Sequence, residues 1–265
     1  MSVQSSANPN SGKAVALVTG GAIRLGKGIA QGLAAGGYDI ALHYNASQGP
    51  AAETSAELRA LGIRCESFAC DFSAADADFA GLIAAVRQTF GRLDYLINSA
   101  SVYDQAPISE SDGALFDRQM AVNLRAPFLL TRAFAEQVER GAILNIVDNK
   151  IAFHQYQYAA YLLSKKSLAE LTRMAAAELA PRIRVNALAP GVVLPAGVRT
   201  PEYIRWREEQ IPLQRKGEVA EIQHAVLALL ENEFITGQVL FVDGGEGLGD
   251  TGRNAASFPG TTNHE

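Results

Sequence analysis

The sequence predicts an α/β fold with a doubly wound parallel sheet of about seven strands in a single domain. Short apolar runs, of the kind that form buried parallel strands, occur at residues 14–19, 38–44, 64–69, 93–98, 142–147, 183–188 and 238–242. Helical spacing separates most of these runs, and alternating strands and helices are typical of a sheet with helices on both faces. The 265 residues contain no repeat and no linker, so one domain accounts for the chain.

The helices expected between these strands span residues up to about 35, then 51–61, 76–90, 114–139, 158–179 and 218–231. The helix at 114–139 is predicted to be interrupted near Asn123 and Pro127, because Asn is a poor helix former. Asn123 either performs a polar task or faces solvent. Residues 189–197 form a Pro/Gly-rich loop, and a mobile segment is expected to continue to about Gln214. Such loops often close over ligands.

The predicted domain covers residues 13–246 and lies between two terminal segments. Residues 1–12 are rich in Ser, Asn and Gln and lack an apolar stretch, so we expect a disordered lead and no secretion signal. Residues 247–265 are rich in Gly, Thr and Asn. We expect this tail to be flexible unless a partner copy orders it.

Composition narrows the possible partners and the compartment. A formal net charge of −5 argues against nucleic acid or an anionic membrane as the main partner, and no run approaches the ~20 apolar residues that span a bilayer. Cys65 and Cys70 lack His or Cys neighbours, which argues against zinc, and no other metal is expected. Small buried thiols in a reducing compartment are the better interpretation, so the sequence predicts a cytoplasmic protein that acts on a small molecule.

The first strand leads into a glycine-rich turn, Gly20–Gly26, and then into a helix. This order aims backbone N–H groups at a phosphate, although a glycine turn alone can also be a plain tight turn. NAD-preferring sites usually carry an acidic residue at the end of the second strand, and this chain has none there. Arg24, Asn45 and Ser47 can instead bind a 2′-phosphate, which favours NADP(H); the alternative is that they are ordinary loop residues.

Two residues farther along the chain leave alternatives open. Asp71, after the third strand, either accepts a hydrogen bond from an adenine amino group or caps the next helix. Tyr103, in the loop 102–113, either contacts a flat ligand or packs on its own loop.

The chain between 142 and 166 carries the candidate chemistry. Asp148 ends the fifth strand, and Tyr161 and Lys165 are four residues apart on one face of the next helix. A free phenol has a pKa of about 10. A neighbouring ammonium is expected to lower this pKa towards working pH, which supports proton donation while a nicotinamide supplies hydride. The alternative for Asp148 is a strand-end residue that caps nearby backbone N–H groups.

Together these residues resemble the short-chain dehydrogenase/reductase family from Val15 to Gly245. The matching marks are Thr19-Gly20 through Gly26, Asp71, Asn98-Ser99-Ala100, Asn123, Tyr161 with Lys165, Pro190-Gly191 and Asp243-Gly244-Gly245. The resemblance implies a Rossmann-like sheet, a nicotinamide cofactor and a homotetramer. It also implies that Tyr161 donates a proton, that Lys165 grips the nicotinamide ribose and lowers the pKa of Tyr161, and that Asn123 supports a proton-relay water.

Two departures from the general family pattern point to a subfamily. Arg24 and Asp148 stand where most members have a glycine and the catalytic serine. With His43-Tyr44 before Ser47, and Ala100-Ser101 before Tyr103, they resemble pteridine reductases and bacterial dihydromonapterin/dihydrofolate reductases. That resemblance implies a pterin ring between Tyr103 and the nicotinamide, with Asp148 joining Tyr161 in supplying a proton to a ring nitrogen.

The resemblance also assigns binding residues. Implied substrate contacts are Arg24, Ser101, Tyr103, Asp148, Tyr161 and Leu194. Implied cofactor contacts are Gly20, Arg24, Leu25, Gly26, His43, Asn45, Ala46, Ser47, Asp71, Phe72, Asn98, Ala100, Ser101, Tyr161, Lys165, Pro190, Gly191 and Val193. Two positions depart from the subfamily: Ala46 replaces a basic residue expected near the 2′-phosphate, and Val193-Leu194-Pro195 lacks the hydroxyl often found there.

The sequence therefore favours an NADPH-dependent reductase of a pterin-like C=N bond. A carboxyl suits such a bond, because a proton must be added to nitrogen, whereas a serine hydroxyl suits a carbonyl oxygen. The first alternative is a carbonyl reductase that acts on a ketone or a 3-oxoacyl thioester. The second is a nucleotide-sensing protein without turnover, against which the intact set of Tyr161, Lys165 and Asn123 argues.

Overall fold

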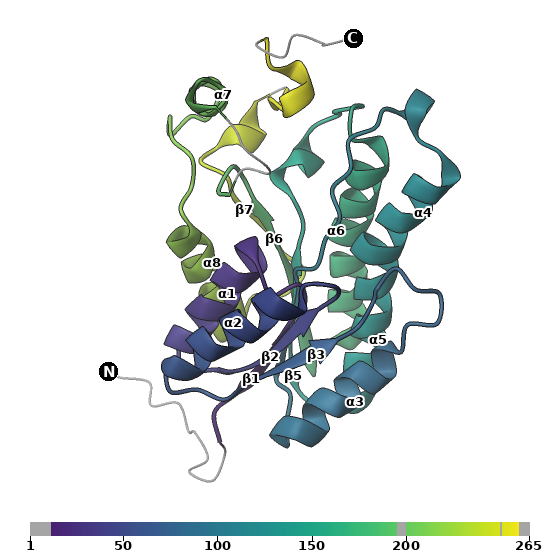
Figure 1. The fold of residues 1–265 in the computed structure, drawn as a ribbon, viewed down its shortest axis with the longest axis vertical. Helices are drawn as coiled ribbons and strands as arrows, with labels where there is room; N and C mark the ends of the chain where they lie inside the picture. The colour runs from purple at the N-terminus through teal and green to yellow at the C-terminus, as the bar shows by residue number, and fades with distance from the viewer. Residues whose placement is uncertain (1–11, 195–199, 250, 260–265) are drawn as a thin grey trace.

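Parallel strands form one sheet in the computed structural model, which describes residues 12–194, 200–249 and 251–259 (Figure 1). Within these residues the sheet has seven strands, in the order β3-β2-β1-β4-β5-β6-β7. Their bounds are β1 (Val15–Val18), β2 (Asp39–Tyr44), β3 (Cys65–Ala69), β4 (Tyr95–Asn98), β5 (Gly141–Ile146), β6 (Ile183–Pro190) and β7 (Val239–Val242). The strand order reverses between β1 and β4, and ligands bind at such a reversal in open α/β sheets.

Helices cover both faces of the sheet (Figure 1). One layer contains α1 (Arg24–Ala35), α2 (Gln48–Ala60) and α8 (Val219–Glu231). The other contains α3 (Phe79–Phe90), α5 (Ala126–Gln137) and α6 (Ala159–Leu179), with α4 (Gly113–Met120) beside α6. A π-helical turn at Ala121–Arg125 joins α4 to α5, so the predicted interruption near Asn123 is confirmed.

Side chains of β1 show why the inner strands of the sheet are mostly apolar. Ala16 and Val18 pack into the cluster that contains α1 and α8, whereas Val15 and Leu17 pack into the cluster that contains α3 and α5. Successive side chains of a strand point to opposite faces, so a strand buried on both faces must be apolar at every position. The predicted Rossmann-like domain with a parallel sheet is confirmed.

Two segments differ from the sequence prediction. The segment expected to be mobile up to Gln214 contains a helix, α7 (Pro201–Glu208), while its residues 195–199 lie outside the described part. The tail expected to be flexible from Gly247 packs against α7 within a single chain: the ring of Phe258 lies 5.3 Å from Trp206 and 5.4 Å from Tyr203 between centroids. The predicted lead, 1–12, lies outside the described residues except for Gly12.

Short one-turn helices complete the fold at Ile108–Glu110, Asn149–Ala152, Glu246–Leu248 and Ala255–Ser257. Three of them lie near α7 and the end of β5, above the carboxyl ends of the strands (Figure 1). Two of them, Asn149–Ala152 and Ala255–Ser257, provide part of the wall of a cleft at this edge of the sheet.

Candidate active site

A cleft of about 500 Å³ opens at the carboxyl ends of the strands. Most of the predicted site residues line it: Gly20, Arg24, Leu25, Gly26, His43, Asn45, Ser47, Asp71, Phe72, Ala100, Ser101, Tyr103, Asp148, Tyr161, Lys165, Pro190, Gly191, Val193 and Leu194. Ala46, Asn98 and Asn123 do not. The cleft therefore brings together residues at or just after the ends of β1, β2, β4, β5 and β6, and residues from the first two turns of α6.

The glycine turn after β1 leaves no room for side chains and leaves backbone donors available. Gly20 has φ +63°, and a Cβ built on Gly26 would lie 2.2 Å from the carbonyl oxygen of Gly20. No side chain caps the N-terminus of α1, where Ile23 is the capping residue. Uncapped N–H groups and the helix dipole favour an anion, so this turn fits the pyrophosphate of a dinucleotide.

Arg24 links the turn to the loop after β6. Its Nη2 donates a hydrogen bond to the carbonyl oxygen of Leu194 at 2.6 Å. Its φ of +53° is unusual for a residue with a side chain, and it occurs where the glycine turn leads into α1. The Arg24 side chain thus lines the cleft between the glycine turn and the loop after β6.

His43, a residue of β2, accepts a hydrogen bond from the glycine turn. The backbone N–H of Gly20 donates to Nδ1 of His43 at 3.1 Å, and Nε2 lies 2.9 Å from the carbonyl oxygen of Cys70. The imidazole stacks on Phe72 with 4.0 Å between centroids and is 2% exposed. Burial lowers the pKa of His43 to about 4, so the ring is neutral and supplies no positive charge to a phosphate.

The end of β2 lines the cleft with uncharged polar groups. Asn45 donates to Asp71 at 3.2 Å, and Ser47 is the first residue before α2, whose N-terminus has no side-chain cap. Asp71 also accepts from the backbone and hydroxyl of Ser73, and these hydrogen bonds lower the pKa of its carboxyl. It therefore forms a local turn, while Asp78 caps the following helix, α3. Ala46 is exposed and does not line the cleft.

Asp148, Tyr161 and Lys165 converge at the end of β5. The hydroxyl of Tyr161 donates to Oδ2 of Asp148 at 2.7 Å, and Oδ1 of Asp148 accepts from the backbone N–H of Lys150 at 2.9 Å. Nζ of Lys165 donates to the carbonyl oxygen of Ile146 at 2.9 Å and lies 5.9 Å from the centroid of the Tyr161 ring. Asp148 thus caps the turn that follows β5, which is one of the two interpretations left open by the sequence, and it also contacts the phenol.

The pKa of Tyr161 differs from the sequence expectation. Burial, followed by the adjacent Asp148 carboxyl, raises this pKa well above its usual value, whereas the sequence predicted that Lys165 lowers it. A hydrogen bond from the phenol to a carboxylate stabilises the protonated phenol. Burial also lowers the pKa of Lys165 to about 8. The phenol is therefore protonated at neutral pH.

Tyr103 packs on aromatic neighbours at the other side of the cleft. Its ring stacks on Tyr158 with 4.7 Å between centroids and meets the edge of Tyr161, also at 4.7 Å. Lys150 donates to the hydroxyl of Tyr103, and its ammonium lies 4.7 Å from the centroid of that ring. Tyr103 therefore packs on its neighbours and lines the cleft at the same time.

The side chains of Asn98 and Asn123 support the cleft without lining it. Asn98 donates to Oδ1 of Asn145 at 2.8 Å, which joins β4 to β5. Asn123, fully buried, donates to the carbonyl oxygen of Val102 and accepts from the backbone N–H of Val102 and from Ser101. Through these hydrogen bonds Asn123 holds the loop that contains Ser101 and Tyr103.

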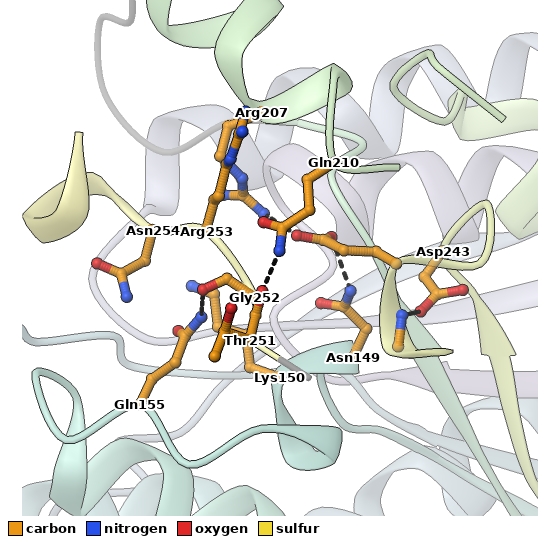
Figure 2. A network of polar contacts seen from close by, with 12 residues as sticks. Asn149, Lys150, Gln155, Arg207, Gln210, Asp243, Thr251, Gly252, Arg253 and Asn254 are labelled. Atoms are coloured by element: carbon orange, nitrogen blue, oxygen red, sulfur yellow. Dashed lines mark hydrogen bonds and ion pairs between the residues drawn. The ribbon is translucent and has the colours of Figure 1, made fainter. Parts of the chain in front are cut away.

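Sequence reasoning missed the wall of the cleft that comes from α7 and the tail. Tyr203, Arg207 and Ala255 line the cleft, as does Lys150. Nη2 of Arg207 lies 2.9 Å from Oε1 of Glu246, and this ion pair is almost completely buried. Figure 2 shows Arg207 near residues of the tail, in which Gly252 and Thr251 accept hydrogen bonds from Gln155 and Gln210. The signals for α7 were Thr200 and Pro201, a capping residue followed by a first-turn proline.

Two further observations concern only the described residues. No group of three or more His, Cys, Asp and Glu side chains among them is placed to hold a metal ion. None of the helices in that part of the chain combines the length and apolarity needed to cross a membrane.

This fold and cleft define an α/β enzyme that binds a dinucleotide at the carboxyl edge of its sheet. A family model described as enoyl-(acyl carrier protein) reductase matches residues 21–246. The chain belongs to the short-chain dehydrogenase/reductase family, as the sequence resemblance predicted, and is an oxidoreductase of that family.

Relatives of two kinds are similar to the chain. Two solved structures are FolM alternative dihydrofolate reductase 1 in complex with NADP, each 35% identical to this chain. The Brucella canis protein has a TM-score of 0.82 and covers 89% of this chain and 95% of its own; the Brucella suis protein has 0.85, 90% and 96%. The 3-oxoacyl-[acyl-carrier-protein] reductase FabG of Staphylococcus epidermidis is 34% identical over 239 residues, which is 87% of this chain and 97% of that protein.

Proposed function

We propose that this protein is an NADPH-dependent reductase of a C=N bond in a pterin-like ring, of the dihydropterin, dihydromonapterin or dihydrofolate type. The observation that carries the proposal is the 2.7 Å hydrogen bond between Tyr161 and Asp148, both of which line the cleft. A carboxyl beside a protonated phenol suits the delivery of a proton to a ring nitrogen. The likeness to FolM structures supports the same substrate class.

In this reaction, different residues of the cleft bind the cofactor, bind the substrate and supply the proton. The glycine turn and the N-terminus of α1 hold the pyrophosphate, while Lys165 lies where it can hold the nicotinamide ribose. When bound, the nicotinamide supplies a hydride to a ring carbon. Tyr161 gives its proton to the adjacent nitrogen, and Asp148 accepts hydrogen bonds from an aminopyrimidine edge and stays within reach of the phenol. Tyr103 offers a flat surface for the ring.

NADP(H) is the proposed cofactor because the end of β2 offers donors to a 2′-phosphate. Asn45, Ser47 and Arg24 line the cleft there, and no acidic residue of β2 faces them. A carboxylate at this place would repel the phosphate. The FolM structures were solved with NADP, which supports the same choice here.

Substitution of Asp148 by Ser tests the role given to the carboxyl. Serine can still cap the backbone N–H of Lys150, so the turn is kept while the carboxyl is lost. We expect NADPH oxidation with a dihydropterin, followed at 340 nm, to fall about 10²–10⁴-fold, the usual contribution of a general acid or base. NADPH affinity, measured by its fluorescence on binding, should stay within about threefold of the wild type, because Asp148 is assigned no phosphate contact.

Tyr161→Phe provides the companion variant, and we expect a similar loss because the proton donor itself is removed. Asp117→Ser is the matched control, since Asp117 is exposed on α4 and outside the cleft. Full pterin activity in Asp148→Ser would remove Asp148 from the mechanism.

The second candidate is an NADP(H)-dependent carbonyl reductase that acts on a ketone or a 3-oxoacyl thioester. The similarity to FabG favours it. A substrate panel of dihydropterins, dihydrofolate, quinones and acetoacetyl thioesters decides between the two classes. Turnover of an oxoacyl thioester without any pterin turnover supports the carbonyl reductase. NADPH binding without turnover of any substrate would point to the nucleotide-sensing alternative.

We also propose a homotetramer in the cytoplasm that acts on a small molecule. Both cysteines are free thiols, Cys65 buried and Cys70 half-buried, as expected in a reducing compartment. Exposed apolar side chains on two separate parts of the surface, described in the Discussion, support the assembly.

A further inference from the structure

We propose that Gln119 of α4 is a positioning residue that holds Tyr103 at the substrate end of the cleft. The inference rests on the proposed function for the substrate, a flat ring that binds beside Tyr103. It adds that the affinity for this ring depends on a side chain that does not itself line the cleft. Gln119 acts through the loop that contains Tyr103.

Gln119 has an unusual place in α4. Among the residues of this helix, all of which the structure describes, Gln119 is the only buried one, and it is 0% exposed. A helix normally buries apolar side chains, because a buried amide is costly unless its donors and its acceptor are hydrogen-bonded. The use of an amide at this position therefore directs attention to its hydrogen bonds.

Both ends of the Gln119 amide are hydrogen-bonded to groups that hold one loop. Nε2 donates to Oδ2 of Asp104 at 2.9 Å, and Oε1 accepts from Nδ2 of Asn123 at 3.0 Å. Asp104 directly follows Tyr103 in the chain. Asn123 bonds to the backbone N–H and carbonyl oxygen of Val102, which directly precedes Tyr103. Gln119 thus joins the residues on either side of Tyr103 in one network.

This network matters for the cleft because Tyr103 lines it. The ring of Tyr103 lies 4.7 Å from the rings of both Tyr158 and Tyr161 between centroids. A flat ligand stacks well only on a ring that is held in one orientation. Farther along the loop, the hydroxyl of Tyr158 donates to Gln105 at 2.9 Å, so loss of the Gln119 amide loosens Tyr103 without releasing the whole loop.

Gln119→Met removes the two hydrogen bonds and keeps the fold. Met is about as long as Gln and is a good helix former. Asp104 keeps its ion pair with Arg118 at 2.9 Å. Nδ2 of Asn123 keeps two acceptors for its two hydrogens, the carbonyl oxygen of Val102 at 3.0 Å and a hydroxyl of α6 at 3.1 Å. No buried polar group loses its last partner, so the variant is expected to fold.

Steady-state kinetics at saturating NADPH test the role of Gln119. The substrate is 7,8-dihydrobiopterin, or acetoacetyl-CoA if the wild type turns over no dihydropterin. In Gln119→Met we expect KM to rise about tenfold, the loss of one hydrogen bond to a charged group. We expect kcat to stay within about threefold, because Tyr161 and Asp148 keep their contact, and NADPH affinity to stay within about twofold.

A double-mutant cycle tests whether Gln119 acts through Tyr103. Tyr103→Leu alone should raise KM, because the flat surface is lost. In that background Gln119→Met should raise KM by less than about twofold further, since no ring remains to be held. A general loss of structure would instead raise KM by the same factor in both backgrounds, and that result overturns the proposal.

The partners of Gln119 supply matched controls. Asp104→Ala should raise KM as much as Gln119→Met, whereas Asp104→Asn keeps an acceptor for Nε2 and should keep KM near that of the wild type. Arg118→Met removes the other partner of Asp104, but this pair is at the surface and should change KM by less than about twofold. Equal rises in Arg118→Met and Gln119→Met would show that the surface pair holds the loop and overturn the assignment.

Hydrogen exchange of the NADP⁺-loaded protein, read by mass spectrometry, needs no substrate. The N–H of Val102 donates to Asn123 at 3.0 Å, so its exchange reports opening of the loop. We expect peptides from 100–106 to exchange about tenfold faster in Gln119→Met, and peptides from 14–19 to be unchanged.

The outcomes separate this inference from the proposed function. A rise in KM for acetoacetyl-CoA, or faster exchange in a protein that turns over no substrate, supports the role of Gln119 while the pterin proposal falls. Dihydropterin turnover with an unchanged KM in Gln119→Met leaves the proposed function and overturns the role of Gln119. Unchanged exchange in a protein that turns over no substrate overturns both.

Discussion

At the scale of single residues, His43 shows how one buried ring shapes the phosphate turn. The N–H of Gly20 donates to Nδ1, so the hydrogen of the imidazole sits on Nε2 and points at the carbonyl oxygen of Cys70. A proton on Nδ1 would break the bond to Gly20. The fold therefore selects the neutral imidazole, and the pKa of His43 falls to about 4.

This selection makes the stability of the protein depend on pH. The pKa of His43 is about 4 in the folded protein and about 6.5 in the unfolded chain. As the pH falls, the unfolded chain therefore binds the proton first. The contribution of neutral His43 to the free energy of unfolding is fully present above pH 6.5 and is lost as the pH falls to 4. The 2.5-unit difference corresponds to about 3 kcal/mol.

His43→Gln, which cannot titrate, should remove this part of the pH dependence although it lowers stability at pH 7.5. Urea unfolding at several pH values between 7.5 and 4 measures the effect. His224→Gln is the control, because His224 is exposed on α8. If the free energy of unfolding depends on pH in His43→Gln as it does in the wild type, another group is responsible for the loss of stability in acid.

The same residues show what sequence can and cannot predict about a site. The sequence placed Asp148, Tyr161 and Lys165 in one cleft, because strand end and helix spacing fix where these side chains emerge. It assigned His43 to the cofactor site, and His43 does line the cleft, but the hydrogen bonds of its ring to Gly20 and Cys70 could not be read from the sequence. It also predicted the wrong direction for the pKa of Tyr161, since burial depth cannot be read from spacing.

At the scale of elements, α7 is held against the body of the domain by one buried ion pair. Arg207 on α7 meets Glu246 in the short helix after β7, and Glu246 in turn meets Asn149 after β5. Removing one partner of such a pair leaves an uncompensated buried charge.

Glu246→Gln should therefore cost about 3–5 kcal/mol of unfolding free energy, measured by urea denaturation. Glu136→Gln is the matched control. Glu136 forms a surface pair with Arg132 at 2.8 Å, both side chains are more than half exposed, and such pairs contribute about 0–1 kcal/mol. Equal losses in the two variants would mean that α7 does not depend on Glu246.

Elements differ in how far the sequence predicts them, for a physical reason. The inner strands β1, β2, β4, β5 and β6 are buried on both faces, so their residues are mostly apolar and stand out in the sequence. α7 reads Pro-Glu-Tyr-Ile-Arg-Trp-Arg-Glu and shows no apolar stripe, because an ion pair and aromatic contacts with the tail hold it. Tertiary contacts of this kind join residues about 40 to 55 positions apart and leave no local pattern.

At the scale of the whole molecule, two groups among the exposed apolar side chains lie on elements that can form interfaces between copies. On the helical layer of α4, α5 and α6 they are Phe116, Phe128, Leu163 and Met174. On β7, the last strand of the sheet, Leu240 is 39% exposed and Phe241 is 40% exposed. The edge strand of a parallel sheet is rarely left open, since its side chains and backbone groups invite association.

Two separate apolar surfaces fit a tetramer with two kinds of two-fold interface. Phe241→Asp places a charge on the β7 surface only, so we expect the tetramer to separate into dimers that keep the helical interface. Leu163→Asp should leave dimers held through β7, and the double variant should be monomeric. Light scattering after size-exclusion chromatography measures each mass. Leu61→Asp, exposed near the opposite edge of the sheet, should remain tetrameric, whereas a monomeric wild type at micromolar concentration would refute the assembly.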